Sequence, residues 1–211
     1  SMVAATVGEQ SVAYGNLLLR WCRAVQSTNP AEARKWLDVV SQLTVSKTDR
    51  ALAARSLAIE GALALRSRDL AKALPLLEKG VEQLRHLPLE GLELAHSLQD
   101  LGVALLQMNE VVCAQTALEE ARKLKAGFFH PKHRDFAVLL SNLGRVAHLQ
   151  KRFPDAERLL RDARELRRRN NQNSTATTET LALVLQERQK FDESKELYET
   201  EVLKADPNNL G

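Results

Sequence analysis

The sequence contains few aromatic residues, which make up 4% of its 211 residues, and only two cysteines. Strands favour aromatic and β-branched side chains, so this scarcity disfavours a sheet-rich fold. Cys22 and Cys113 lie far apart, in segments of apolar helical periodicity. This placement disfavours a disulfide framework, and we expect two buried, reduced thiols in an intracellular, cytoplasmic protein.

Long hydrophobic runs are also missing, since none approaches the roughly 20 residues that span a bilayer. The opening stretch, SMVAATVGEQ, has neither the charged nor the hydrophobic region of a signal peptide. A targeting segment removed ahead of this stretch is left open. The formal net charge of +3 is too small to indicate a nucleic-acid partner by itself.

Motifs of catalysis and metal binding are absent as well. The sequence has no glycine-rich phosphate loop, no C-x-x-C pair and no H-E-x-x-H or G-x-S-x-G arrangement. His130 and His133 in the stretch HPKH have no nearby cluster of cysteines or carboxylates that would complete a metal site. We therefore expect a protein that is not an enzyme and that uses no cofactor or metal.

What the sequence does contain is a repeat built from helix-favouring residues, chiefly leucine, alanine, arginine, glutamate and lysine. A small residue recurs inside helical runs, in steps of 41, 42 and 38 residues, at Gly61, Gly102, Gly144 and Ala182. Glycine inside a helix costs roughly 0.5–1 kcal/mol relative to alanine, so its return at one register indicates close helix–helix packing. We expect Ala156, early in the next helix, to be the packing partner of Gly144.

Each repeat reads as two amphipathic helices joined by a tight turn, with glycine and proline between repeats. The spacing predicts one array with units at 10–45, 50–85, 92–125, 134–169 and 174–207. The first unit aligns poorly in its first helix, which is typical of a capping repeat. We therefore expect it to protect the end of the array.

The stretch SNLGRVAHLQKRFPDAERLLRDARELR, residues 141–167, resembles a tetratricopeptide repeat. Like that family, it carries Leu-Gly in the first helix and two alanines, Ala156 and Ala163, spaced by seven in the second. The steps near 42 residues and the His130-Pro131 pair are similar to the kinesin-light-chain subtype. The resemblance implies an all-α fold, a right-handed superhelical solenoid of antiparallel helix pairs.

The same resemblance implies a protein–protein interaction scaffold that holds a peptide or helix of another protein on its concave surface. In the family, residues beside the Leu-Gly positions line that surface. Asn142 is the foremost candidate, because an amide both donates and accepts hydrogen bonds, as an extended peptide requires. The other expected partner-binding residues are Arg55, Gln99, Asp100, Val103, Leu106, Arg145, His148, Glu179 and Gln186.

Three alternatives remain open at this point. The arginine-rich helix at 158–169 could bind nucleic acid or an acidic partner, although glutamates precede arginines there by one turn, as in Glu157–Arg161 and Glu165–Arg169. That spacing predicts a solvated, ion-paired helix face. The chain could instead be the regulatory or cargo-binding arm of a larger complex. An uncapped terminal repeat could also pair with a second copy.

Overall fold

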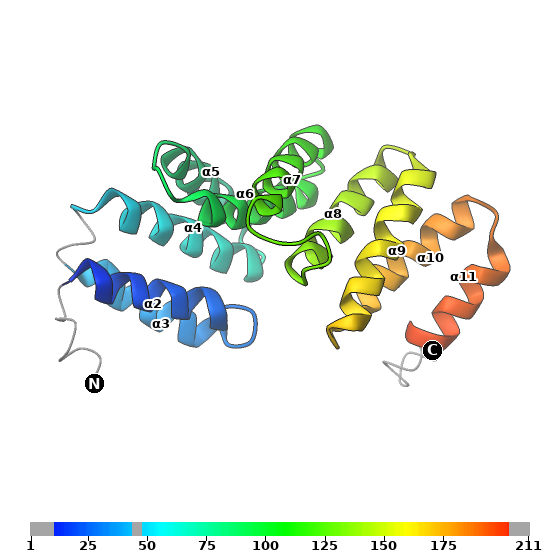
Figure 1. Ribbon diagram of the computed structural model, residues 1–211, viewed down its shortest axis with the longest axis horizontal. Coiled ribbons are helices and arrows are strands. Elements are labelled where there is room, and N and C mark those ends of the chain that lie inside the picture. Colours follow the sequence, from blue (N-terminus) through cyan, green and yellow to red (C-terminus); the bar gives the residue numbers. More distant parts are fainter. Residues whose placement is uncertain (1–10, 44–47, 203–211) are drawn as a thin grey trace. The chain divides into compact units, whose positions relative to one another are not determined.

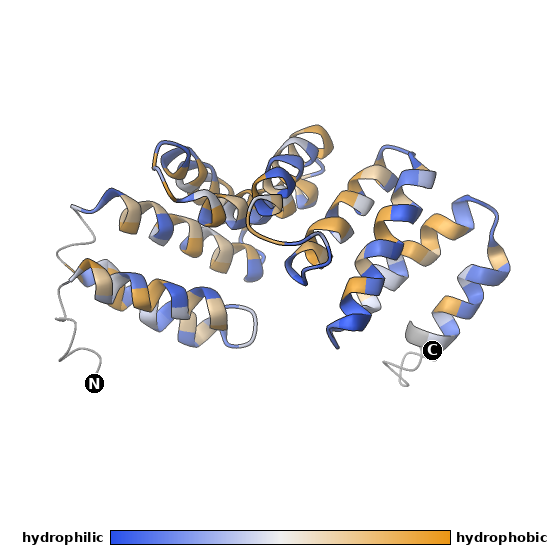
Figure 2. Cartoon of the chain, viewed as in Figure 1, coloured by the Kyte–Doolittle hydropathy of each residue, from blue (hydrophilic) through white to orange (hydrophobic). Residues whose placement is uncertain are grey.

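Helices make up all the regular structure of the described chain. The computed structural model describes residues 11–43 and 48–202, without the side chains of the last two, and no strand occurs in these ranges. The elements are α2 (Val12–Val25), α3 (Pro30–Gln42), α4 (Arg50–Arg66), α5 (Leu70–Arg85), α6 (Gly91–Gln107), α7 (Val111–Ala126), α8 (Asp135–Leu149), α9 (Phe153–Arg169), α10 (Thr175–Glu187), α11 (Phe191–Leu197) and the π-helix η2 (Tyr198–Val202). Figure 2 shows that the helices carry both hydrophobic and hydrophilic residues.

By position, each of the five predicted repeats contains two described helices, but the repeat boundaries stay a prediction. Residues 10, 44–45 and 203–207 of these repeats lie outside the described ranges. Helix α2 packs on α3, α4 on α5, α8 on α9 and α10 on α11 (Figure 1). The chain forms two compact units that divide between Asn109 and Glu110. The N-terminal unit holds α2 to α6 and the C-terminal unit holds α7 to η2. Because this division falls inside the predicted repeat 92–125, a single continuous array stays a prediction.

Side-chain caps begin only the first four helices. Ser11, Asn29, Asp49 and Asp69 each accept a hydrogen bond from the backbone N–H three residues on, at the starts of α2 to α5. Such caps satisfy one of the free N–H groups of the first turn. The N-cap residues of α6 to α11 form no such bond.

A left-handed residue ends the first helix of each of the last four repeats. Arg68, Asn109, Lys151 and Gln189 have φ angles of 61°, 63°, 59° and 60°, and each lies seven residues after the small residue of its repeat. After Arg68, Lys151 and Gln189, the next backbone N–H bonds back to a carbonyl five residues earlier, as from Asp69 to Ala64, over 3.0 Å. This is the geometry of a Schellman end, and it reverses the chain within two residues. The turn between α2 and α3 has no left-handed residue, so the first pair differs from the other four.

Gly61 and Gly144 each make room for a leucine, and for Gly144 this is not the expected alanine. A Cβ atom added to Gly144 would lie 2.6 Å from Cγ of Leu160, and one added to Gly61 would lie 2.8 Å from Cγ of Leu77. The prediction that Ala156 is the partner of Gly144 was therefore off by one helical turn. Ala156 is fully buried, four residues before the leucine that fills the space.

The two cysteines lie in different environments. Cys22 is buried, and its thiol donates to the carbonyl oxygen of Ala33 over 3.3 Å. Burial raises the pKa of this thiol to about 11, despite an opposing backbone hydrogen bond. Cys113 is exposed, so the expectation of two buried thiols was wrong for it. Position 113 lies on the solvent side of α7, which sequence periodicity alone did not distinguish from the core side.

Candidate functional site

One side of α8 carries an open stripe in the C-terminal unit. Val138, Asn142, Arg145 and Leu149 follow one another at helical spacings of four, three and four residues, so they share one side of the helix. Val138 is 38% exposed and Leu149 is 48% exposed, so both apolar side chains are accessible to a ligand. We call these four residues the α8 stripe. The sequence pattern predicted Asn142 and Arg145 as binding residues but not Val138 and Leu149. The helical spacing of four, three and four residues would have indicated all four.

Asn142 does not project from the surface as expected, because it is only 7% exposed. Its amide forms no hydrogen bond with the described part of the chain. Neither of its amide atoms is fully buried without a partner, so the amide is open to solvent and to a group from outside the chain. Arg145 is half-buried, and its guanidinium makes no ion pair with a described residue. His148 faces Phe153, with the ring centroids 6.0 Å apart.

The equivalent positions of α10 lie 38 residues further on. Ser141 and Thr177 form a hydroxyl–hydroxyl hydrogen bond of 3.0 Å that fixes the register of α8 and α10. Leu183, the equivalent of Arg145, is 52% exposed. Glu179 and Gln186 are exposed too, but they lie about 180–200° around α10 from Thr177 at 100° per residue. They therefore point away from α8, and the structure does not bring them together with the α8 stripe.

In the N-terminal unit, the expected binding residues already have partners inside the chain. Arg55 donates to both carboxylate oxygens of Glu90 and to Oδ1 of Asn16, the latter over 2.7 Å. Asp100 accepts from Arg23 of α2 over 3.0 Å. A second nitrogen of Arg23 donates to Glu93, also over 3.0 Å. Arg55 and Asp100, which the repeat register predicted to bind a partner, are therefore paired with oppositely charged residues of the same chain.

The remaining candidates of this unit are also closed in or engaged. Leu106 is 6% exposed and belongs to the core, so its assignment to an open binding surface was wrong. Val103 is half-buried, and Gln99 has an interaction within the chain. In α4, Ile59 and Ala62 are 2% and 1% exposed. These positions are the repeat equivalents of Asn142 and Arg145.

The pKa shifts of Glu93 and Arg23 show that both groups stay charged and paired within the N-terminal unit. Burial opposes ionisation of Glu93, but Arg23 beside it outweighs that cost and holds the pKa of the carboxyl below its usual range. The same carboxylates raise the pKa of Arg23 against the effect of its own burial. The side chains of Arg23 and Asp100 are each 15% exposed. Removing the guanidinium would therefore strand two partly buried negative charges.

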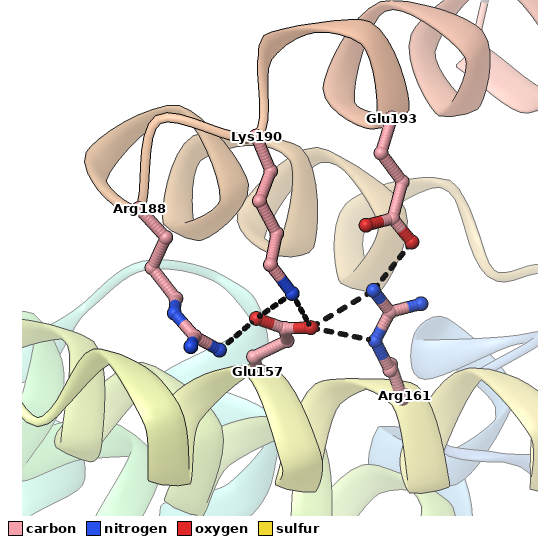
Figure 3. A network of polar contacts seen from close by, with 5 residues as sticks. All are labelled: Glu157, Arg161, Arg188, Lys190 and Glu193. Atoms are coloured by element: carbon pink, nitrogen blue, oxygen red, sulfur yellow. Dashed lines mark hydrogen bonds and ion pairs between the residues drawn. The ribbon is translucent and has the colours of Figure 1, made fainter.

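In α9, the glutamate expected on a solvated face is buried instead. Glu157 is 6% exposed and accepts hydrogen bonds from Arg161, Lys190 and Arg188, with Arg161 also bound to Glu193 (Figure 3). The spacing to Arg161 was predicted correctly, but the partners 31 and 33 residues away were not. The network joins α9 to the turn between α10 and α11. It holds the last two repeats together.

Burial alone would raise the pKa of Glu157, yet the hydrogen bonds from Lys190 and Arg161 lower it to about 2. The other arginines of the basic helix are engaged as well. Arg158 pairs with Asp155, and Arg168 and Arg169 both pair with Glu165. Arg167 donates to a backbone carbonyl, and Arg164 has a partner in the chain. Arg168 and Arg169 share the single charge of Glu165, and Arg167 meets a neutral carbonyl, so these contacts neutralise only part of the positive charge of this helix.

The histidines of HPKH shape the linker between α7 and α8. Nδ1 of His130 accepts from the backbone N–H of Lys132 over 3.2 Å, and Nδ1 of His133 accepts from that of Asp135 over 3.3 Å. Among the residues that the structure describes, no group of three metal-ligating side chains lies close together. Within the same residues, no helix is both long enough and apolar enough to cross a membrane.

Comparison with known proteins agrees with the repeat architecture. Residues 136–171 match the model of the tetratricopeptide repeat family. The structure of BtubC (BKLC) from P. vanneervenii is similar, with a TM-score of 0.68 at 15% identity over 96% of this chain and 93% of that one. A Podosopora anserina kinesin light chain with nearly identical TPR-like repeats has a TM-score of 0.63 at 19% identity, over 92% and 96%. No curated protein matches the sequence. The predicted all-α tetratricopeptide-like solenoid fold is confirmed.

Proposed function

We propose that this chain, a tetratricopeptide-repeat protein of the kinesin-light-chain-like type, is a protein-interaction scaffold that binds an extended peptide of a partner along the α8 stripe. Repeat solenoids generally use extended surfaces of this kind for binding. The stripe offers an amide, a guanidinium and two apolar side chains within one side of one helix. These groups suit the backbone, an acidic group and the apolar side chains of a peptide.

The observation that carries the proposal is the amide of Asn142. It is 7% exposed and has no hydrogen-bond partner in the described part of the chain. Its amide atoms are not among the fully buried polar atoms that lack a partner, so solvent reaches them and a ligand can do so too. A peptide backbone would supply both an N–H and a carbonyl, and Arg145 beside it would take a carboxylate.

The structure favours the C-terminal unit over the N-terminal one for this role. Arg55 and Asp100 would have to leave Glu90 and Arg23 before contacting a partner. Nucleic-acid binding through α9 is not favoured, because its arginines are paired with Glu157, Glu165 and other groups of the chain. A role as the cargo-binding arm of a larger complex would use the same α8 stripe, and the kinesin light chain among the similar structures makes it a natural extension.

The test is to compare partner capture by the wild-type chain and by Asn142→Ala and Arg145→Glu variants, with the captured proteins quantified by mass spectrometry. Arg20→Glu is the matched control, because Arg20 is an exposed arginine of α2 in the other unit. We expect the two stripe variants to lose the same proteins about tenfold or more, since a reversed charge repels an acidic ligand. Equal capture by correctly folded stripe variants would refute the proposal.

A further inference from the structure

A cleft lies elsewhere in the C-terminal unit. It has a volume of about 490 Å³ and is lined by α7, the linker before α8, α8 itself and the second half of α9. Its apolar lining comes from Ala126, Pro131, Phe136, Leu140 and Leu166. A cleft of a few hundred Å³ with an apolar floor and a few placed polar groups is the usual form of a binding site.

This cleft is separate from the α8 stripe. Phe136 and Leu140 lie one helical turn apart on α8, whereas Arg145 lies on another side. At 100° per residue, the two sides are about 160° apart around the helix axis. Binding in the cleft and binding along the stripe therefore use opposite sides of α8.

Most charges at the rim of the cleft are already neutralised. Arg122 pairs with Glu119 over 2.8 Å, and Arg169 pairs with Glu165 over 2.6 Å. These pairs hold the side chains in place and leave little net charge for a ligand. They also make an inorganic anion or a polyanion a poor match for the rim.

Two rim charges differ from the rest. Lys132 and Asp162 both line the cleft, and neither makes an ion pair or a side-chain hydrogen bond with the described residues. Lys132 comes from the linker, where its backbone is held by Nδ1 of His130. Asp162 comes from α9, which packs on α8. The apolar floor thus carries one unpaired cation and one unpaired anion from separate elements.

We propose that this cleft binds a short segment of a partner protein in which one apolar side chain lies between an acidic and a basic residue. The apolar side chain packs on Phe136 and Leu140, the acidic residue pairs with Lys132, and the basic residue pairs with Asp162. Charge complementarity selects this ligand, because a peptide segment must carry both an acidic and a basic residue to form ion pairs with both Lys132 and Asp162. The order of the two charges along the segment sets its direction in the cleft.

A random heptapeptide display library provides a direct test with a defined probe. Selection on the full chain is expected to enrich acidic–apolar–basic peptides of one charge order. Selection on the double variant Lys132→Asp/Asp162→Lys is expected to enrich the reversed order. Each single variant, Lys132→Asp or Asp162→Lys, should weaken a wild-type-selected peptide about tenfold, since one attraction becomes a repulsion.

The controls separate this cleft from the α8 stripe and from self-association. Arg145→Glu should leave the selected peptides and their affinities unchanged, so loss of stripe binding would not affect the result. Both swapped residues are exposed, so an unchanged melting temperature should verify the fold of the variants. The proposal is overturned if no peptide is enriched, if the double variant keeps the wild-type order, or if sedimentation shows that a second copy occupies the cleft.

Discussion

The two units differ at positions that the repeat makes equivalent. Ala62 in the N-terminal unit and Leu183 in the C-terminal unit both occupy the place of Arg145, yet Ala62 is 1% exposed and Leu183 is 52% exposed. Arg55 occupies the place of Val138, and it is bound to Glu90 and Asn16. Val138 itself is 38% exposed. The same face of the same repeat is therefore closed in one unit and open in the other.

The difference comes from side chains outside the repeat pattern. In the N-terminal unit, α2 supplies Asn16 and Arg23, which reach Arg55 and the carboxylates of α6. In the C-terminal unit, the long-range ion pairs gather around Glu157 on α9 and leave the α8 stripe open. The repeat register therefore predicts which helix face can bind a partner. Hydrogen bonds and ion pairs with other helices of the same unit decide whether that face is open.

Replacing Arg23 with methionine should have the largest effect, because it removes the ion pairs that close this face in the N-terminal unit. Glu93 and Asp100 would lose their shared cation in a partly buried site, so we expect the unfolding free energy to fall by about 3 kcal/mol. Chemical denaturation measures this loss. Arg20→Met is the control on the same helix, because Arg20 is exposed, and it should change stability by less than about 0.5 kcal/mol. An equally stable Arg23 variant would mean that this network does not hold the N-terminal unit closed.

Replacing Glu157 with glutamine should cost less, about 1–2 kcal/mol, although it removes the centre of a larger network. Its three cations, Arg161, Arg188 and Lys190, have side chains that are 37%, 32% and 39% exposed, so water can solvate them once the carboxylate is gone. Chemical denaturation compares the two variants. If Glu157→Gln lost more unfolding free energy than Arg23→Met, the network of the C-terminal unit would contribute more to stability than that of the N-terminal unit, contrary to expectation.

The same variant predicts a pH dependence. The folded-state pKa of Glu157 is lowered to about 2 from its ordinary value of 4.5, so this carboxylate stabilises the fold above pH 4.5. That contribution is lost as the pH falls toward 2. Wild-type stability should therefore decline more steeply than that of Glu157→Gln across this window. Glu165→Gln is the control. Hydrogen bonds from Arg168 and Arg169 also lower the pKa of Glu165 to about 2, but its side chain is 40% exposed and screened by solvent, so this substitution should change the slope much less.

Much of the fold could be predicted because it depends on local spacing. The small residues at 61, 102, 144 and 182 set the repeat, and the left-handed turns seven residues later follow the same spacing. The binding surface was harder, because openness depends on residues distant in sequence. Nothing local to Asp100 indicates that Arg23 would reach it from 77 positions away. The burial of Glu157 was missed for the same reason.

A smaller change probes what the units share. Gly144→Ala and Gly61→Ala should each lower stability by about 1–2 kcal/mol, since overpacking outweighs the gain in helix propensity. The added Cβ at Gly61 would also lie 3.0 Å from the backbone nitrogen of Leu77. Backbone yields less readily than a side chain, so Gly61→Ala should cost at least as much. Thermal unfolding of both variants measures the order, and a neutral Gly61→Ala would contradict it.

The smallest effect tests the turn that both units have in common. Lys151 has a φ of 59°, a conformation that costs a side-chain-bearing residue roughly 1 kcal/mol and costs glycine nothing. Lys151→Gly should therefore raise the unfolding free energy by up to about 1 kcal/mol, and Arg68→Gly should do the same in the N-terminal unit. Gln150→Gly is the control, because Gln150 has a φ of −84° and gains no relief, and because its side chain also loses its hydrogen bonds with Gln115 and Arg152, so its substitution should destabilise. If both Lys151→Gly and Gln150→Gly destabilise equally, the left-handed turn carries no strain, and the repeat spacing of these residues reflects the path of the chain alone.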